Sequence, residues 1–137
     1  MATRELMTSD YFRVIADDGS HVVRLVRTAT SYPTVETIEQ TFAAINGAVA
    51  GLGRDWALLI DSRDGPLRND PAFEELLGRV RGRIVQRFAS AAVLVKSAVG
   101  RLQVERYARE DRGSPRVFGD EREAITYLTA QRAGSKP

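Results

Sequence analysis

Six residues at one junction of the sequence are the first candidates for chemistry. The stretch "WALLIDSRDGPLRNDP", residues 56–71, changes from apolar to charged within one step. Two carboxylates, a hydroxyl and two guanidinium groups this close together suit acid/base work, phosphorylation or recognition of a ligand or protein partner. The candidate partner- or ligand-binding residues are Asp61, Ser62, Arg63, Asp64, Gly65 and Arg68.

Hydrolytic catalysis finds little support in these residues. A serine triad would have to bring His21, the only histidine, beside Ser62, but His21 directly follows a predicted turn. Asp61 and Asp64 would act as an acid/base pair only if one pKa were raised, and the sequence offers no reason for that. The absence of cysteine removes thiolate nucleophiles and thiolate metal sites. We therefore expect no catalytic residue, no metal and no cofactor.

A set of acids also resembles that of a response-regulator receiver, which holds Mg²⁺ beside a phosphorylated aspartate. The set would consist of Asp17 and Asp18, Asp61 after one strand, and Lys96 after another. Its spacing differs, because a glycine, a serine and a second strand follow Asp18 where a receiver continues into a helix. We interpret the first two acids as a hairpin turn and Lys96 as the end of a strand.

A second cluster, in residues 78–88, is basic. The segment "GRVRGRIVQRF" flanks the apolar side of a predicted helix with Arg79, Arg81, Arg83 and Arg87. Such a face suits an acidic partner, an anionic headgroup or RNA. Its simpler interpretation is a solvated flank with cations toward the helix C-terminus, where the helix dipole favours them. Because the net charge is only +2 and no aromatic residue lies between the arginines, we expect no nucleic-acid binding.

The elements that must position these residues alternate between two periods. Residues 11–29 predict two strands around an Asp-Asp-Gly-Ser turn. Residues 34–52 predict an amphipathic helix capped by Thr34. The continuous apolar run "WALLI" predicts a central strand that is buried on both faces. Asp70 followed by proline predicts the start of a second long helix.

The rest of the chain continues the alternation. We expect a strand at 91–95, a helix from residue 99 to 110, a short strand at 116–118 and a helix after the cap Asp120. Strands separated by helices imply right-handed crossovers and a mostly parallel sheet. The predicted fold class is therefore α/β, a single-domain sandwich with a mixed, mostly parallel sheet, an N-terminal β-hairpin and about four helices.

Composition fits one globular domain. The chain has 137 residues, of which 43% are apolar and 28% charged, enough to bury one core. We expect a single domain over 1–137 with its core at about 10–132, and flexible ends at 1–9 and 133–137. No segment has the roughly 20 apolar residues of a membrane span, and the N-terminus lacks a signal-peptide run. We expect no membrane span and a cytoplasmic location, which the lack of cysteine also fits.

Four features together resemble the STAS domain, the fold of anti-sigma-factor antagonists and sulfate-transporter tails. They are the opening hairpin, the "LLIDSRDG" junction, the helix after it and the closing "VFGDEREAITYL". The similarity is to small standalone bacterial relatives and spans about residues 10–132. In that family a strand ends in an Asp-Ser-Ser-Gly-like turn, and a partner kinase phosphorylates its second serine at a helix N-terminus. Here Arg63 stands at that position and "PLRN" delays the next helix, so Ser62 is the candidate phosphorylation site of a diverged switch.

The resemblance implies a non-catalytic regulatory or protein-interaction module. Its partner would be a protein, such as a kinase or a switch protein, and the resemblance also allows a homo-oligomer. The alternative is a domain that binds a small apolar ligand or a nucleotide between helices and sheet near residues 61–65. A ligand binder should have a cavity on the order of several hundred Å³ near the strand ends. An interaction module should carry an exposed apolar patch rimmed by charge.

Overall fold

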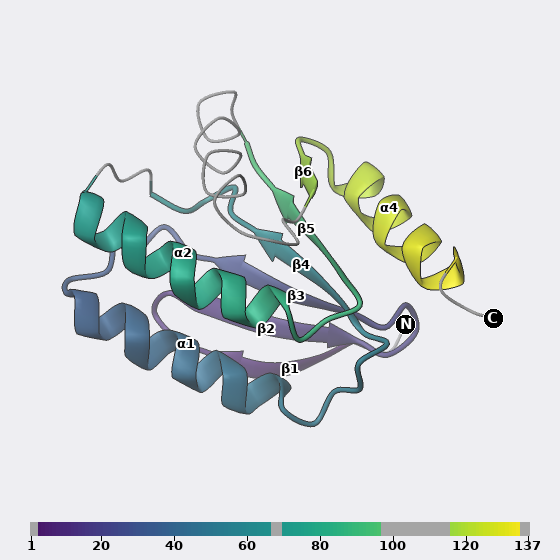
Figure 1. The fold of residues 1–137 in the computed structure, drawn as a ribbon, viewed down its shortest axis with the longest axis horizontal. Helices are drawn as coiled ribbons and strands as arrows, with labels where there is room; N and C mark the ends of the chain where they lie inside the picture. The colour runs from purple at the N-terminus through teal and green to yellow at the C-terminus, as the bar shows by residue number, and fades with distance from the viewer. Residues whose placement is uncertain (1–2, 67–69, 97–115, 135–137) are drawn as a thin grey trace.

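The computed structural model describes residues 3–66, 70–96 and 116–134. These residues form one six-stranded sheet in sequential order, with helices on both of its faces (Figure 1). The strands are β1 (Thr3–Thr8), β2 (Phe12–Asp17), β3 (Val22–Arg27), β4 (Ala57–Asp61), β5 (Ser90–Leu94) and β6 (Arg116–Phe118). The helices are α1 (Val35–Val49), α2 (Pro71–Val85) and α4 (Glu121–Gly134).

The sheet is mixed. β1, β2 and β3 pair antiparallel, whereas β3, β4, β5 and β6 pair parallel. In the parallel register Val26 lies opposite Asp61, and Asp61 lies opposite Leu94. The carboxyl ends of the central strands therefore meet at one edge of the sheet. In open α/β sheets this is the edge that carries binding sites.

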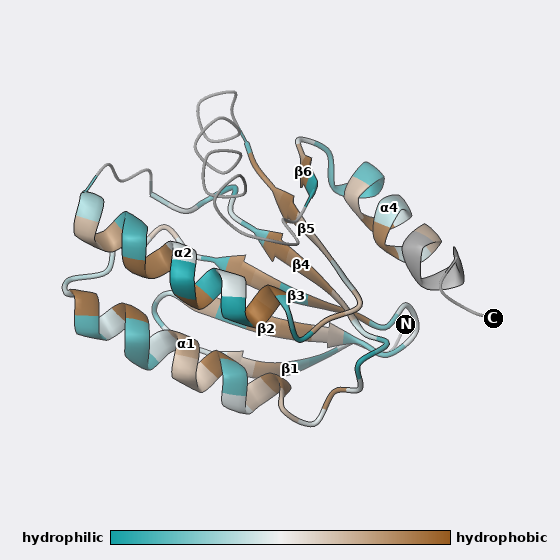
Figure 2. Cartoon of the chain, viewed as in Figure 1, coloured by the Kyte–Doolittle hydropathy of each residue, from teal (hydrophilic) through white to brown (hydrophobic). Residues whose placement is uncertain are grey.

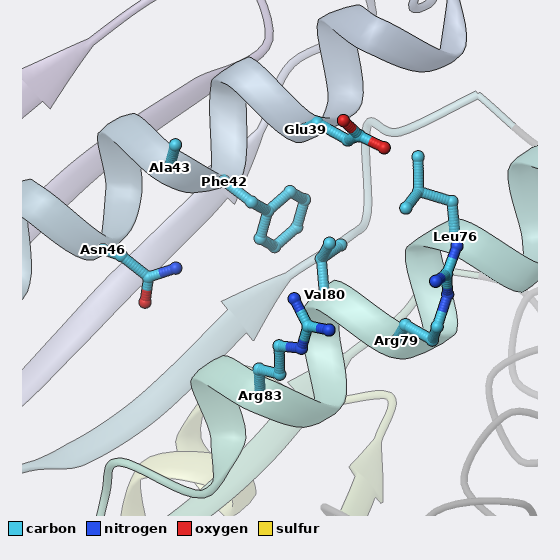
Figure 3. A pocket seen from close by; sticks show the side chains of 8 residues that line it. All are labelled: Glu39, Phe42, Ala43, Asn46, Leu76, Arg79, Val80 and Arg83. Carbon is cyan, nitrogen blue, oxygen red and sulfur yellow. The ribbon is translucent and has the colours of Figure 1, made fainter.

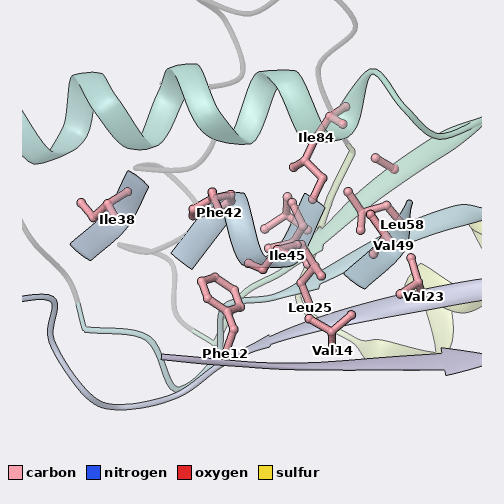
Figure 4. Packing of buried hydrophobic residues seen from close by; sticks show 14 of the residues in the cluster. Phe12, Val14, Val23, Leu25, Ile38, Phe42, Ile45, Val49, Leu58 and Ile84 are labelled. Atoms are coloured by element: carbon pink, nitrogen blue, oxygen red, sulfur yellow. The ribbon is translucent and has the colours of Figure 1, made fainter. Parts of the chain in front are cut away.

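Two apolar layers enclose the sheet. α1 and α2 cover one face, where Val14, Leu25, Ile45, Leu58 and Ile84 pack together (Figure 4). α4 covers the opposite face over β4, β5 and β6, and its buried side chains Ala124 and Leu128 meet those strands. Figure 2 shows the resulting concentration of apolar residues in the central strands.

The prediction of a strand buried on both faces is confirmed at "WALLI". Residues 56–60 are all buried, because α2 and α1 lie over one face of β4 and α4 lies over the other. The predicted helix caps are also present. Thr34 accepts from the backbone of Thr37, and Asp70 precedes Pro71 and accepts from the backbone of Ala72. Asp120 accepts from the first amides of α4.

One expectation about the N-terminal residues is wrong, and one about a helix falls outside the described residues. Residues 3–8, expected outside the core, form the edge strand β1, whose Leu6 and Met7 pack partly against the core. A bulge between Glu5 and Met7 interrupts the alternation that would have marked this strand in the sequence. The helix expected at 99–110 lies outside the described residues, so the described part of the chain has three helices and not four. Of these three, none has both the length and the apolar character to cross a membrane.

Candidate functional site

The turn that follows β4 is held by its own side chains. Asp61 ends the strand and accepts from Arg63 three times: from Nε to Oδ1 at 3.0 Å, from Nη2 to Oδ2 at 2.8 Å, and from the backbone N–H to Oδ1 at 3.2 Å. The Ser62 amide donates to the Leu94 carbonyl at 2.9 Å, and the Gly65 amide donates to the Ser62 carbonyl at 3.1 Å. The turn is thereby fixed to the end of β5 and folded on itself.

A chain of four charges connects this turn to two other elements. Glu121, the first residue of α4, accepts from Arg63 Nη2 at 3.1 Å and from Arg24 Nη1 at 2.9 Å. Arg24 belongs to β3, so the series Asp61, Arg63, Glu121 and Arg24 links β3, the β4 turn and α4. We call it the ion-pair chain. Sequence reasoning missed Arg24 and Glu121, which are 97 positions apart, and no local pattern signals their contact.

The ion-pair chain keeps both carboxylates ionised. Burial opposes the charge of Asp61, but hydrogen bonds from Arg63 outweigh burial, so the net pKa of Asp61 is lowered. The hydrogen bond from Arg24 lowers the pKa of Glu121. The hydrogen bond to Asp61 raises the pKa of the Arg63 guanidinium. A lowered pKa makes Asp61 unsuitable as a general acid near neutral pH.

Two polar side chains of the turn take no part in these described hydrogen bonds and ion pairs. Ser62 is half-buried and Asp64 is exposed, and neither side chain makes a hydrogen bond or ion pair with another described residue. Arg68, the last of the predicted site residues, lies outside the described residues. The turn therefore offers a hydroxyl and a carboxylate on a fixed backbone.

Gly65 packs against a side chain that cannot easily move. A Cβ at this position would lie 2.9 Å from Arg27 Cγ and 3.4 Å from the Ser62 carbonyl oxygen. Arg27 is held further out, because its Nη1 donates to the Tyr11 and Thr28 carbonyls and its guanidinium lies 4.3 Å from the centre of the Tyr32 ring. The close approach of backbone and stem explains a glycine here.

Gly65→Ala is expected to lower the free energy of unfolding by about 1 kcal/mol, because the added methyl must displace the Arg27 stem or the turn. Urea unfolding measures this change. Gly47→Ala is the matched control, since a Cβ at Gly47 in α1 meets nothing within 4 Å. There alanine should stabilise by up to about 1 kcal/mol through helix propensity. Equal shifts for the two variants would contradict the packing assigned to Gly65.

The histidine that a serine triad would need does not lie near Ser62. His21 directly precedes β3 and Ser62 directly follows β4, so the two lie at opposite ends of the parallel strands. His21, at φ 55°, stacks on Trp56 with ring centres 4.8 Å apart, and its Nδ1 lies 2.8 Å from Asp55 Oδ2. A triad of His21 and Ser62 is thus excluded by distance along the sheet.

The receiver-like set is separated in the same way. Asp17 ends β2, which runs antiparallel to β3, so it lies with Asp18 at the edge opposite to Asp61. Asp18 instead pairs with Arg4 at 2.9 Å. Within the described ranges no group of three or more histidine, cysteine or acidic residues is placed to hold a metal.

The four arginines of the basic cluster at residues 78–88 lie in different surroundings. Arg79 and Arg83 line a cavity of about 340 Å³ between α1 and α2 (Figure 3). Arg87 instead donates to the backbone and side-chain oxygens of Asn46 in α1, both at 3.2 Å. Arg81 is half-buried, and its charge is near enough to contribute to the lowered pKa of Arg27, for which burial is the larger cause. None of residues 61–65 lines this cavity, so it is not the strand-end cavity expected of the ligand-binding alternative.

Comparison with known proteins gives the fold. The chain matches no protein-family model and no curated protein. It is similar in structure to an uncharacterized protein of the DUF3478 family with a SpoIIAA-like fold, from Shewanella loihica PV-4. The two chains are 19% identical with a TM-score of 0.50, and the match covers 93% of this chain and 92% of the other. The fold is therefore SpoIIAA-like, which confirms the predicted STAS-like architecture.

Proposed function

We propose that this SpoIIAA-like domain is a non-catalytic regulatory module that binds a protein partner through the turn Asp61–Gly65. The observation that carries the proposal is that some side chains of the turn hold its conformation while others remain free of bonds to the described residues. The Asp61 and Arg63 side chains hold the turn together, whereas the side chains of Ser62 and Asp64 are engaged by no described residue. A rigid turn that presents unengaged donors and acceptors loses little entropy when it binds a partner.

The same geometry supports a role without catalysis. Asp61 is ionised and bound to Arg63, so it is not available as an acid, and as a base it would have to give up those bonds. Ser62 has no histidine beside it, since His21 lies at the other edge of the sheet. A hydroxyl without a base is a poor nucleophile.

The charges around Ser62 favour an unphosphorylated turn. A phosphate there would add negative charge next to Asp61 and Asp64. It would gain the Arg63 guanidinium only by drawing it from Asp61 and Glu121. We propose that Arg63, at the position of the family's phosphorylated serine, holds the turn in one binding state. Intact-mass measurement of the protein from its native host should then show no phosphorylated population.

The binding surface is tested by affinity capture from the native host with three tagged baits. They are the wild-type chain, Asp64→Lys, and the control Glu123→Lys, which makes the same charge change at an exposed position of α4. We expect a protein that is retained by the wild type and by Glu123→Lys and lost with Asp64→Lys. Light scattering of the purified chain shows whether the partner is a second copy. A set of captured proteins that is identical for all three baits would contradict the proposal.

A further inference from the structure

The cavity between α1 and α2 has the form of a short groove. It extends over two turns of each helix, from Glu39 to Asn46 on α1 and from Leu76 to Arg83 on α2, which is about 10 Å. Figure 3 shows Phe42 of α1 pointing across the groove toward Val80 of α2. Arg87, two residues after the end of α2, donates to Asn46 of α1 and ties the C-terminal end of α2 to α1.

The groove carries an excess of positive charge. Arg79 and Arg83 are exposed and lie one helical turn apart on the same wall. Neither is within ion-pair distance of a carboxylate in the described part of the chain. Among the described residues that line the groove, Glu39 on the opposite wall is the one acid. The planar guanidinium of either arginine can donate two parallel hydrogen bonds to a carboxylate, and the second arginine adds a further positive charge.

We propose that this groove binds a small organic anion, a carboxylate carried on a short apolar body. Arg79 and Arg83 hold the carboxylate, with the Asn46 side chain at the same end of the groove as Arg83. The short apolar body lies against Ala43 and Val80, which line the groove and are not fully buried. The proposal is independent of the function assigned to the turn, because no residue of 61–65 lines the groove.

The dimensions favour a free small molecule over a docked helix. A volume of about 340 Å³ lies within the range of small-molecule sites, about 300–1,000 Å³. A docking helix would need exposed apolar surface to cover, but Phe42 is already 3% exposed and Leu76 5% exposed. Glu39 also disfavours an extended polyanion such as a nucleic acid, which would place phosphates along both walls.

Octanoate is a suitable probe, and amide chemical shifts of the isotope-labelled full chain report where it binds. We expect saturable shifts at groove residues, including Ala43, Asn46 and Val80. Arg79→Gln and Arg83→Gln should each weaken binding by about five- to tenfold, because each removes one charge-assisted hydrogen-bond donor group. Higher salt should also weaken it. 1-Octanol, which has the same chain without the charge, should bind far more weakly than octanoate.

Arg122→Gln is the matched control, with the same charge change on α4 behind the sheet, and it should bind octanoate like the wild type. Thermal unfolding of all variants checks that they are folded. Equal weakening by Arg122→Gln, equal binding of octanol, or shifts that do not map to the groove would overturn the proposal. A glutamate-rich helical peptide is titrated in parallel. Saturable binding of that peptide without binding of octanoate would replace the small anion by a protein partner.

Discussion

Replacing Leu128 by alanine should lower the free energy of unfolding by about 3 kcal/mol, the usual cost of emptying a fully buried leucine site. Leu128 is 0% exposed and belongs to a small core between α4 and the sheet, in which seven of the described residues are buried. Its loss should loosen α4 in particular, and with it Glu121. Urea unfolding measures the global effect, and amide hydrogen exchange shows whether α4 opens before the sheet.

Thr126→Ala, two positions away on an exposed part of α4, is the control for this variant. It should change stability by less than about 0.5 kcal/mol. If α4 anchors the ion-pair chain as described, Leu128→Ala should also broaden or shift the amide signals of Arg63 and Arg24, whereas Thr126→Ala should not. Unchanged stability of Leu128→Ala would show that α4 is not packed on the sheet as the structure has it.

Asp61→Ala is expected to cost about 1–2 kcal/mol of stability and to release the turn. The Asp61 side chain is 9% exposed and accepts three hydrogen bonds from Arg63. Removing one partner of a fully buried ion pair usually lowers the stability by more than about 2 kcal/mol. The Arg63 side chain, however, is 40% exposed and keeps Glu121, so water and that second carboxylate offset part of the loss. Asp61→Asn should recover part of it, since its amide oxygen still accepts from the Arg63 backbone.

The contribution of this pair should disappear in acid. The folded-state pKa of Asp61 lies below its ordinary value of 3.8, so the folded protein binds this proton less readily than the unfolded chain. The pair therefore stabilises the fold above pH 3.8, and the stabilisation is lost as the pH falls through the lowered pKa. The stability difference between wild type and Asp61→Asn should be constant near neutral pH and shrink below 3.8. Asp64→Ala removes a carboxylate of the same turn that bonds no described residue, and the same measurement on it is the control.

The order of elements followed from local patterns in the sequence. Apolar spacing of three and four placed α1 and α2, and their caps Thr34 and Asp70 are where the sequence placed them. The run "WALLI" indicated a strand covered on both faces, and its position before "DSRDG" put the turn at a strand end. These features are predictable because caps and periodicity depend on residues within one or two turns of each other. β1 was missed for the same reason, since its bulge breaks the period.

The tertiary structure decided which charges meet. In the sequence Arg63 is an unexpected residue at a serine position, and Glu121 is one acid in a helix start. Only the packing of α4 behind β4 and β5 brings Glu121 to both Arg63 and Arg24. The groove arises likewise from the side-by-side placement of α1 and α2, which turns Arg79 and Arg83, two of the three arginines of α2, toward α1.

The sequence by itself thus determined the succession of the described strands and helices from β2 onward and the location of the turn Asp61–Gly65. The three-dimensional arrangement determined that Arg63 is engaged in the ion-pair chain and that Ser62 and Asp64 are not. The physical reason is the distance along the sequence between the residues that interact. Hydrogen bonds of caps and turns are encoded by neighbours in the chain, whereas an ion pair between residues 24 and 121 exists only after the sheet and α4 have packed.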